Sequence, residues 1–138
     1  MKIPAQVKLL DKNRGLIPYS KAKVFYVDSK GKTSTNLTVE LTTFNGRVHT
    51  LFTNYKNGTQ IEVFDGLQVY TQEGWKDIEK IKKGDKVVVF ESVTFNYGGT
   101  ELRMIFSDVQ SRQSKKVENL EAISTPIDTL IVDGLLVR

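Results

Sequence analysis

The sequence predicts an all-β fold with little helix, because short β-rich segments recur and turn-forming pairs such as Asn45-Gly46 and Asp65-Gly66 separate them. Such pairs favour tight hairpin turns between neighbouring strands. Helical periodicity is thin, with one short turn at residues 77–81 and a weaker option at residues 37–43, so the β interpretation is favoured. The polar, basic residues 111–116 predict an exposed loop. The expected strands cover residues 22–27, 47–52, 59–64, 67–71, 86–90, 101–106 and 129–132.

The residue types present exclude several kinds of chemistry. The 138 residues suffice for one domain with a core. The chain has no cysteine, which excludes disulfides, thiolate metal sites and cysteine nucleophiles. It has one histidine, His49, and no Gly-x-Ser-x-Gly elbow, so Ser-His-Asp hydrolase chemistry is not expected. Covalent chemistry would have to use a Ser or Thr oxygen, and no metal or cofactor is expected.

Charge and hydropathy limit the kinds of partner that the sequence predicts, nucleic acid and membrane among them. The net charge is +4, but the basic residues are scattered, with Lys82-Lys83 and Lys115-Lys116 as the adjacent pairs. Nucleic-acid binding is therefore permitted without being required, and we expect none. Apolar runs are too short to span a membrane, and no signal-peptide core follows Met1. The sequence predicts a cytoplasmic monomer without a membrane partner.

The last segment carries the first resemblance to a known family. An apolar strand at residues 129–132 is followed by Asp133-Gly134 and by a second apolar strand that runs to Arg138. This arrangement resembles the last strands of an intein, a self-excising protein segment. In that family His-Asn normally follows, and the Asn side chain attacks its own peptide bond. Here Arg138 holds the His position and no Asn follows.

Residues 58–88 carry the second resemblance. They look like the central motif of inteins and Hedgehog-type (Hint) domains, with Gly74-Trp75 and Gly84-Asp85 in the matching places. The head of the motif departs from the family pattern Thr-x-x-His: Phe64 stands at the Thr position and Leu67 at the His position, with Asp65-Gly66 as the turn between them. The family's general acid for the first acyl shift is thus missing. A simple hairpin turn is the alternative interpretation.

The start of the resembling region is placed at Ser20. The family begins on a nucleophile followed by a strand and a Gly turn, and residues 20–32 fit that pattern with Ser20 as the nucleophile and Tyr19 as the upstream neighbour of the scissile bond. An ordinary polar residue at a strand start is the alternative for Ser20. The predicted domains are therefore an extein-like flank at 1–19 and a splicing domain at 20–138. Residues 9–18 resemble a segment of phage family B DNA polymerases.

Three further residues are candidates. Asp128 precedes the last strand and would either orient groups at the C-terminal junction or be a solvated strand-edge carboxylate. Arg138 could polarise the C-terminal carbonyl as a permanent cation, but it cannot shuttle protons at neutral pH. His49 lies in an alternating segment, so a strand-face residue is favoured over a catalytic replacement for the missing histidine.

The resemblance implies a Hint fold, a horseshoe-like β structure with pseudo-two-fold halves that bring Ser20 and Arg138 together. It also implies autocatalytic, single-turnover protein splicing: ester formation at Ser20, transesterification and C-terminal Asn cyclisation, without a cofactor. Without that Asn, the chain as given is expected to remain a precursor. The partners would be flanking exteins in cis or a complementary split fragment in trans. The alternative is a non-catalytic basic β-barrel binding module of phage type.

Overall fold

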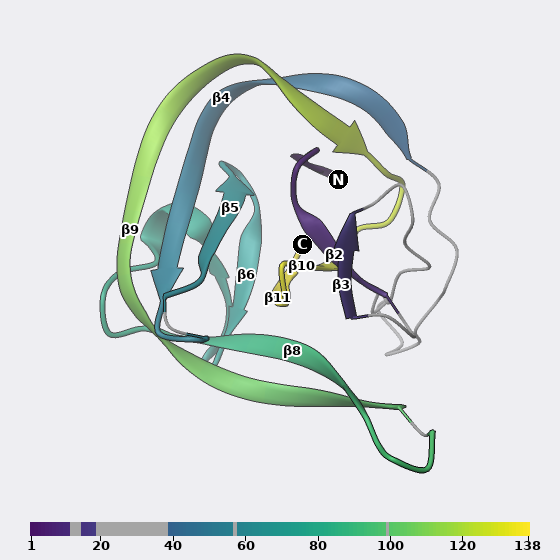
Figure 1. The fold of residues 1–138 in the computed structure, drawn as a ribbon. Helices are drawn as coiled ribbons and strands as arrows, with labels where there is room; N and C mark the ends of the chain where they lie inside the picture. Colours follow the sequence, from purple (N-terminus) through teal and green to yellow (C-terminus); the bar gives the residue numbers. More distant parts are fainter. Residues whose placement is uncertain (12–14, 19–38, 57, 99) are drawn as a thin grey trace.

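The computed structural model describes residues 1–11, 15–18, 39–56, 58–98 and 100–138. The described strands form one antiparallel sheet (Figure 1). One short 3-10 helix, η2, follows β7. The elements are β1 (Lys2–Pro4), β2 (Lys8–Asp11), β3 (Gly15–Pro18), β4 (Glu40–Thr53), β5 (Gln60–Phe64), β6 (Gln68–Thr71), β7 (Gly74–Asp77), η2 (Ile78–Lys80), β8 (Lys86–Thr94), β9 (Thr100–Ser124), β10 (Leu130–Val132) and β11 (Leu135–Val137).

Two long strands, β4 and β9, form the curved frame of the molecule. They pair antiparallel over almost the whole of β4 and bend together over the centre (Figure 1). The ladder shifts register between Phe44 and Gly46, and the Asn45 side chain there accepts a hydrogen bond from the backbone N–H of Asn119 at 2.9 Å. Bulges of this kind increase local twist and bending, which explains how one pair of strands wraps around the core.

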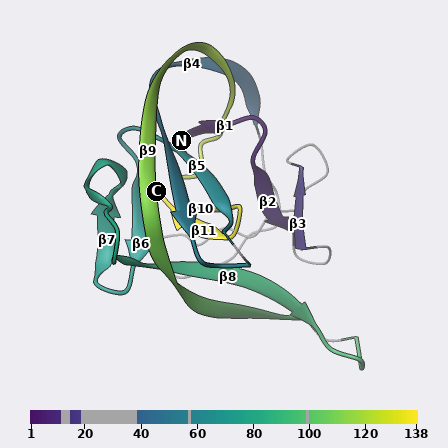
Figure 2. The ribbon, with the colours of Figure 1, turned by 60° about the vertical axis from the view of Figure 1, so that its left-hand side comes forward.

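The other half of β9 pairs with β8 as a long arm that extends from the body in both ribbon views (Figures 1 and 2). The arm's outer face is partly apolar, since Met104 and Phe106 are about half exposed, at 52% and 49%. At its tip the rings of Phe95 and Tyr97 stack with centroids 5.2 Å apart.

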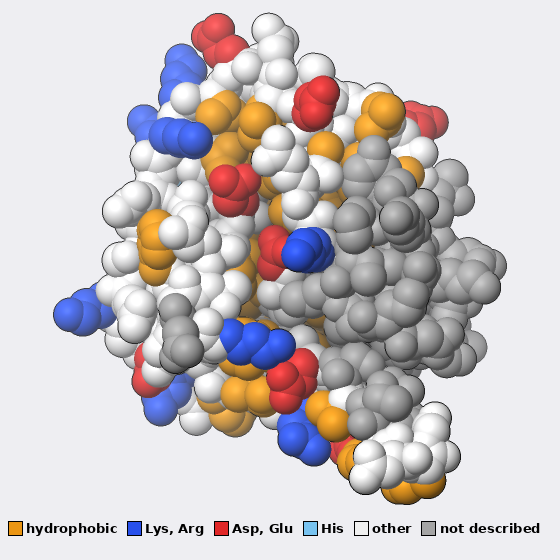
Figure 3. All heavy atoms as spheres, viewed as in Figure 1, with side chains coloured by type: hydrophobic (Ala, Val, Ile, Leu, Met, Phe, Trp, Pro, Cys, Tyr) orange, Lys and Arg blue, Asp and Glu red, His pale blue; other side chains and the backbone are white. Residues whose placement is uncertain are grey.

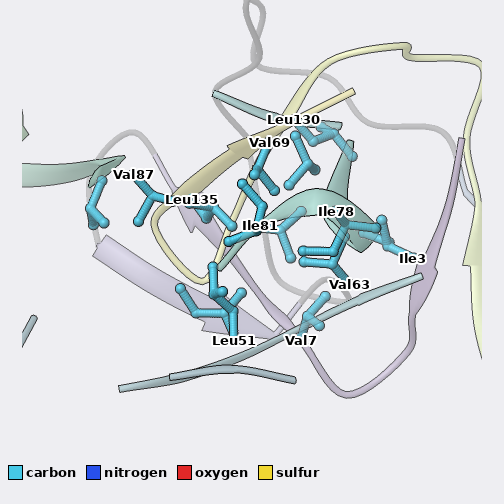
Figure 4. Packing of buried hydrophobic residues seen from close by; sticks show 14 of the residues in the cluster. Ile3, Val7, Leu51, Val63, Val69, Ile78, Ile81, Val87, Leu130 and Leu135 are labelled. Atoms are coloured by element: carbon cyan, nitrogen blue, oxygen red, sulfur yellow. The ribbon is translucent and has the colours of Figure 1, made fainter. Parts of the chain in front are cut away.

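The main core lies inside the curve and draws on strands from the whole chain. Inward-facing residues of β4, β5, β6 and β8 meet η2 and the terminal strands there, and each is almost completely buried (Figure 4). The alternation along β4 and β5, where Leu51 lies opposite Ile61, places these apolar side chains on one face. The labelled residues of this cluster are Ile3, Val7, Leu51, Val63, Val69, Ile78, Ile81, Val87, Leu130 and Leu135.

Both ends of the described chain lie within the curve, near one another in the two ribbon views (Figures 1 and 2). β1 pairs with the end of β9, and Ile3 is 1% exposed. β11 pairs with β10, β6 and β8. Residues 1–11 and 15–18 are therefore part of the same sheet as the central motif.

The expected all-β fold is confirmed, and the expected strands that fall on described residues correspond to β4, β5, β6, β8, β9 and β10. Those expected at 59–64, 67–71 and 129–132 each begin one residue before the observed strand. The expected strand at 22–27 lies outside the described residues. The loop prediction for residues 111–116 was wrong, because these residues lie inside β9 and pair with β4. Their polar side chains are mostly exposed, so the strand is specified by its partner's backbone rather than by its own apolar pattern.

Candidate functional site

The central turn at residues 64–67 links β5 to β6 and is held by its own packing. Phe64 is 1% exposed and stacks on Phe44 with ring centroids 3.8 Å apart. Leu67 is partly buried, and its N–H donates to the carbonyl of Phe64 at 3.3 Å. Gly66 takes φ = +89°, a conformation that glycine adopts without strain. The two positions at which the sequence resemblance places the Thr and His of the intein motif, Phe64 and Leu67, thus carry apolar side chains packed inward.

Asp65 of this turn binds the buried histidine. The His49 side chain is 3% exposed and its Nε2 lies 2.8 Å from Asp65 Oδ1, while the Asp65 side chain is 48% exposed. On the other side of the ring, Nη1 of Arg112 lies 2.9 Å from His49 Nδ1. An arginine can only donate, so Nδ1 is an acceptor and Nε2 carries the proton that it donates to Asp65. The hydrogen bonds fix one neutral tautomer.

Arg138 is held beside the same turn. Its Nε donates to Gln68 Oε1 at 2.8 Å, and its guanidinium lies 4.4 Å from the centre of the Trp75 ring. Gln68 Nε2 in turn donates to Asp77 Oδ1 at 2.9 Å. That hydrogen bond is the main cause that lowers the pKa of Asp77 below its ordinary value of 3.8, with a smaller contribution from Lys80. Arg138 is therefore an oriented cation whose aromatic and amide neighbours fix its plane.

At the other end of the chain, Met1 is fixed to the segment that follows β9. Its amino group donates to the carbonyl of Thr125 at 2.7 Å, and the N–H of Thr125 donates to the Met1 carbonyl at 3.0 Å. Thr125 is 3% exposed. Asp128 is exposed and accepts a hydrogen bond from Thr129 Oγ1 at 3.4 Å. This environment is that of a solvated carboxylate at the start of a strand.

The predicted site residues divide into three groups. Phe64, Asp65, Gly66 and Leu67 form one turn, and Arg138 joins it through Gln68, three residues after Asp65. Asp128 lies on the segment before β10, where its side chain accepts from Thr129 Oγ1 and makes no hydrogen bond to that turn within the described residues. Ser20 and Tyr19 lie outside the described residues. Whether Ser20 meets Arg138 stays a prediction.

Sequence reasoning set His49 aside as a strand-face residue and did not identify Arg112 or Gln68 as members of the site. His49 and Asp65 are sixteen residues apart, and their contact depends on the β4–β5 register that places His49 opposite Val63. One signal was available: His49 alternates with Leu51 on the inward face of an amphipathic strand, and a buried imidazole requires polar partners. Among the described residues, no group of three His, Asp or Glu side chains could hold a metal ion.

In the described ranges no helix is long and apolar enough to cross a bilayer. Neither a protein-family model nor a curated protein matches the sequence. Solved structures do match.

The structure resembles the DnaX mini-intein from Spirulina platensis, with a TM-score of 0.74, 15% identity, and coverage of 100% of this chain and 99% of that chain. It also resembles the Ssp DnaB mini-intein variant M86, with a TM-score of 0.64, 15% identity, and coverage of 99% and 93%. The G-1F mutant of that variant matches with a TM-score of 0.66 and 14% identity, over 100% of this chain and 98% of that chain. The described sheet, its central turn and these likenesses together show that the chain has the fold of the mini-inteins, the Hint fold.

Proposed function

We propose that this chain is a self-processing domain of the protein-splicing type. The observation that carries the proposal is that the two ends lie near one another inside one curved sheet, with Met1 bound to Thr125 and Arg138 bound to Gln68. Splicing passes an upstream acyl group to a residue that follows the domain, so both junctions must lie within reach of each other. The fold supports the proposal because it brings the two ends close to one another.

The first placement of the upstream junction, which the sequence resemblance implies, is at Ser20. In this placement Ser20 Oγ attacks the carbonyl carbon of Tyr19. The C–N bond between Tyr19 and Ser20 breaks, an ester forms, and the amino group of Ser20 is released. The step is uphill for a free peptide and needs a strained bond or a stabilised oxyanion. Since Leu67 occupies the family's histidine position, a proton donor for the leaving nitrogen would have to come from elsewhere.

A second placement of the upstream junction, at residue 1, has direct structural support. Ile3, Val7 and Leu9 are at most 5% exposed within the main core. Release of residues 1–19 would expose all three, at a cost of roughly 1.5–3 kcal/mol for each side chain. The likeness to the DnaX mini-intein also extends over 100% of this chain, so the matched region includes residues 1–19. We therefore favour residue 1 as the start of the splicing domain.

One experiment separates the two placements. A folded peptide tag is fused before residue 1, a His-Asn-Ser segment is added after Arg138, and the product is treated with hydroxylamine and weighed by intact mass. Cleavage before residue 1 in Met1→Cys, and not in the parent sequence, supports the placement at residue 1. Cleavage after Tyr19 that disappears in Ser20→Ala supports the placement at Ser20. No cleavage in any of these, even with Leu67→His added, contradicts the splicing proposal.

The binding-module alternative receives no support from the face shown in Figure 3, where Lys and Arg side chains are interspersed with Asp and Glu. A nucleic-acid site would concentrate basic side chains and give an affinity that falls steeply with salt. Titration of a labelled single-stranded oligonucleotide at two salt concentrations tests this alternative on the same protein sample.

A further inference from the structure

The hydrogen bonds of His49 belong to a closed ring around the central turn. Asp65 binds His49, and His49 binds Arg112. Arg112 then donates from Nε to the carbonyl of Ile81 at 2.8 Å and from Nη2 to the carbonyl of Glu79 at 2.7 Å. The N–H of Ile78, at the start of η2, donates to the carbonyl of Leu67 at 3.0 Å and returns the ring to the turn.

This ring fixes the turn from both sides. The Asp65 side is tied to β4, because the N–H of Asp65 also donates to the carbonyl of Arg47 at 2.9 Å. The Leu67 side is tied to η2. A buried donor or acceptor that loses its partner is penalised, and each buried link of the ring therefore supports the others.

The central turn leads directly into β6, the strand that pairs with the C-terminal end of the chain. Gln68 is the first residue of β6, and its N–H and carbonyl pair with the carbonyl and N–H of Arg138 at 2.9 and 3.0 Å. A shift of the turn would move Gln68 and, with it, the backbone and side-chain bonds of Arg138. Asp65, which binds the buried histidine, is thus three residues away from the strand pairing at the C-terminal junction.

We propose that His49 is a positioning residue: through Asp65 it fixes the central turn, and through Gln68 it fixes Arg138 at the C-terminal junction. This inference rests on the proposed function for its catalytic consequence, but its structural consequence can be measured without splicing. His49 itself is buried and need not touch the reacting atoms. Its role is set by two hydrogen bonds that a glutamine amide can also make, donating to Asp65 and accepting from Arg112.

The test measures amide hydrogen exchange at Gln68 and Arg138, relative to the amides of β8, in the full chain. In His49→Leu, exchange at these two amides rises about tenfold or more relative to β8, because their local opening becomes easier. In His49→Gln it stays within about threefold of the parent. Thr53→Val is the matched control: Thr53 is buried on the same face of β4, and its Oγ1 accepts from the N–H of Tyr55 instead. That variant should leave the ratio unchanged.

Equal exchange ratios in His49→Leu and Thr53→Val, or failure of His49→Gln to restore protection, would overturn the proposal. Should His49→Leu not fold, Asp65→Ala removes the same bond from a half-exposed side chain, and the same rise at Gln68 and Arg138 is expected. Nitrogen chemical shifts of the imidazole supply a second readout, since the proposed ring requires the Nε2–H tautomer. When cleavage is observed in the junction experiment, His49→Leu should slow the cleavage and His49→Gln should restore its rate. Absence of cleavage counts against the splicing proposal, and the hydrogen-exchange result alone then decides whether His49 is a positioning residue.

Discussion

Gln68 and Arg138 are joined by three hydrogen bonds, two between their backbones at 2.9 and 3.0 Å and one from Arg138 Nε to Gln68 Oε1 at 2.8 Å. The guanidinium lies over Trp75, which is the single tryptophan of the chain. Tryptophan fluorescence of the chain therefore reports on the surroundings of Trp75, which include this contact and the ring of Tyr70.

Arg138→Ala should shift the emission of Trp75 to longer wavelength, because the indole loses its cover and gains contact with water. The loss of stability should be about 0.5–1 kcal/mol, since the contact is at the surface. Arg103→Ala, at an exposed arginine of β9, is the matched control and should leave the emission unchanged. Identical spectra for Arg138→Ala and the parent would show that the contact is not maintained in solution.

Gly134→Ala should destabilise the fold by about 2–3 kcal/mol. Gly134 has φ = +88°, and an added Cβ would lie 3.0 Å from Val89 Cγ1 and 3.2 Å from the Phe90 carbonyl oxygen. The cost thus combines backbone strain with a close contact. Denaturant unfolding measures the difference.

Gly74→Ala separates these two contributions. Gly74 has φ = +103°, but an added Cβ would meet no atom within 4 Å. The Gly74→Ala variant should lose stability through backbone strain alone, by about 1 kcal/mol. Equal losses in the two alanine variants would mean that the β10–β11 turn relaxes away from β8.

The stability contributed by the Asp85 charge should depend on pH. Burial acts to raise the pKa of Asp85, but hydrogen bonds from the Lys76 ammonium and the Lys82 backbone outweigh it and hold the pKa below its ordinary value of 3.8. The folded state therefore binds the proton more weakly than the unfolded state. The contribution is present above pH 3.8 and is lost as the pH falls through the folded-state pKa.

Asp85→Asn should accordingly cost about 1–2 kcal/mol at pH 7, and the cost should shrink as the pH falls below 3.8. Asp108→Asn is the control, because Asp108 is half exposed and 3.8 Å from Lys86. It should cost less than about 0.5 kcal/mol. Unfolding curves at several pH values measure the stability loss caused by each substitution. A loss for Asp85→Asn that is independent of pH would rule out the Asp85 charge as its origin.

The fold class was predictable from sequence because turn chemistry is local: Asp65-Gly66 marks the observed turn between β5 and β6, and Asp133-Gly134 marks the hairpin turn between β10 and β11. What depends on pairing across the chain was not predictable. Residues 111–116 look like a loop but form a strand because β4 supplies partners, and the His49–Asp65 contact requires the β4–β5 register. The burial of Ile3 likewise follows from pairing with Ile123 of β9, more than a hundred residues later.

The burial of β1 allows the upstream boundary of the domain to be tested by mutation. Ile3 is 1% exposed, and its backbone pairs with that of Ile123. Ile3→Ala should therefore cost about 2–5 kcal/mol, the range for truncating a buried isoleucine. A detachable flank at residues 1–19 would instead tolerate the change with a loss below about 0.5 kcal/mol.

Lys2→Ala is the matched control for this boundary test, since Lys2 is an exposed neighbour on β1 whose Nζ donates to the Thr43 carbonyl at 3.2 Å. It should cost less than about 0.5 kcal/mol. A large difference between the two variants by denaturant unfolding would place the start of the domain at or before β1. Equal, small losses would instead return the boundary to Ser20, because residues 1–19 would then contribute little to the folded core.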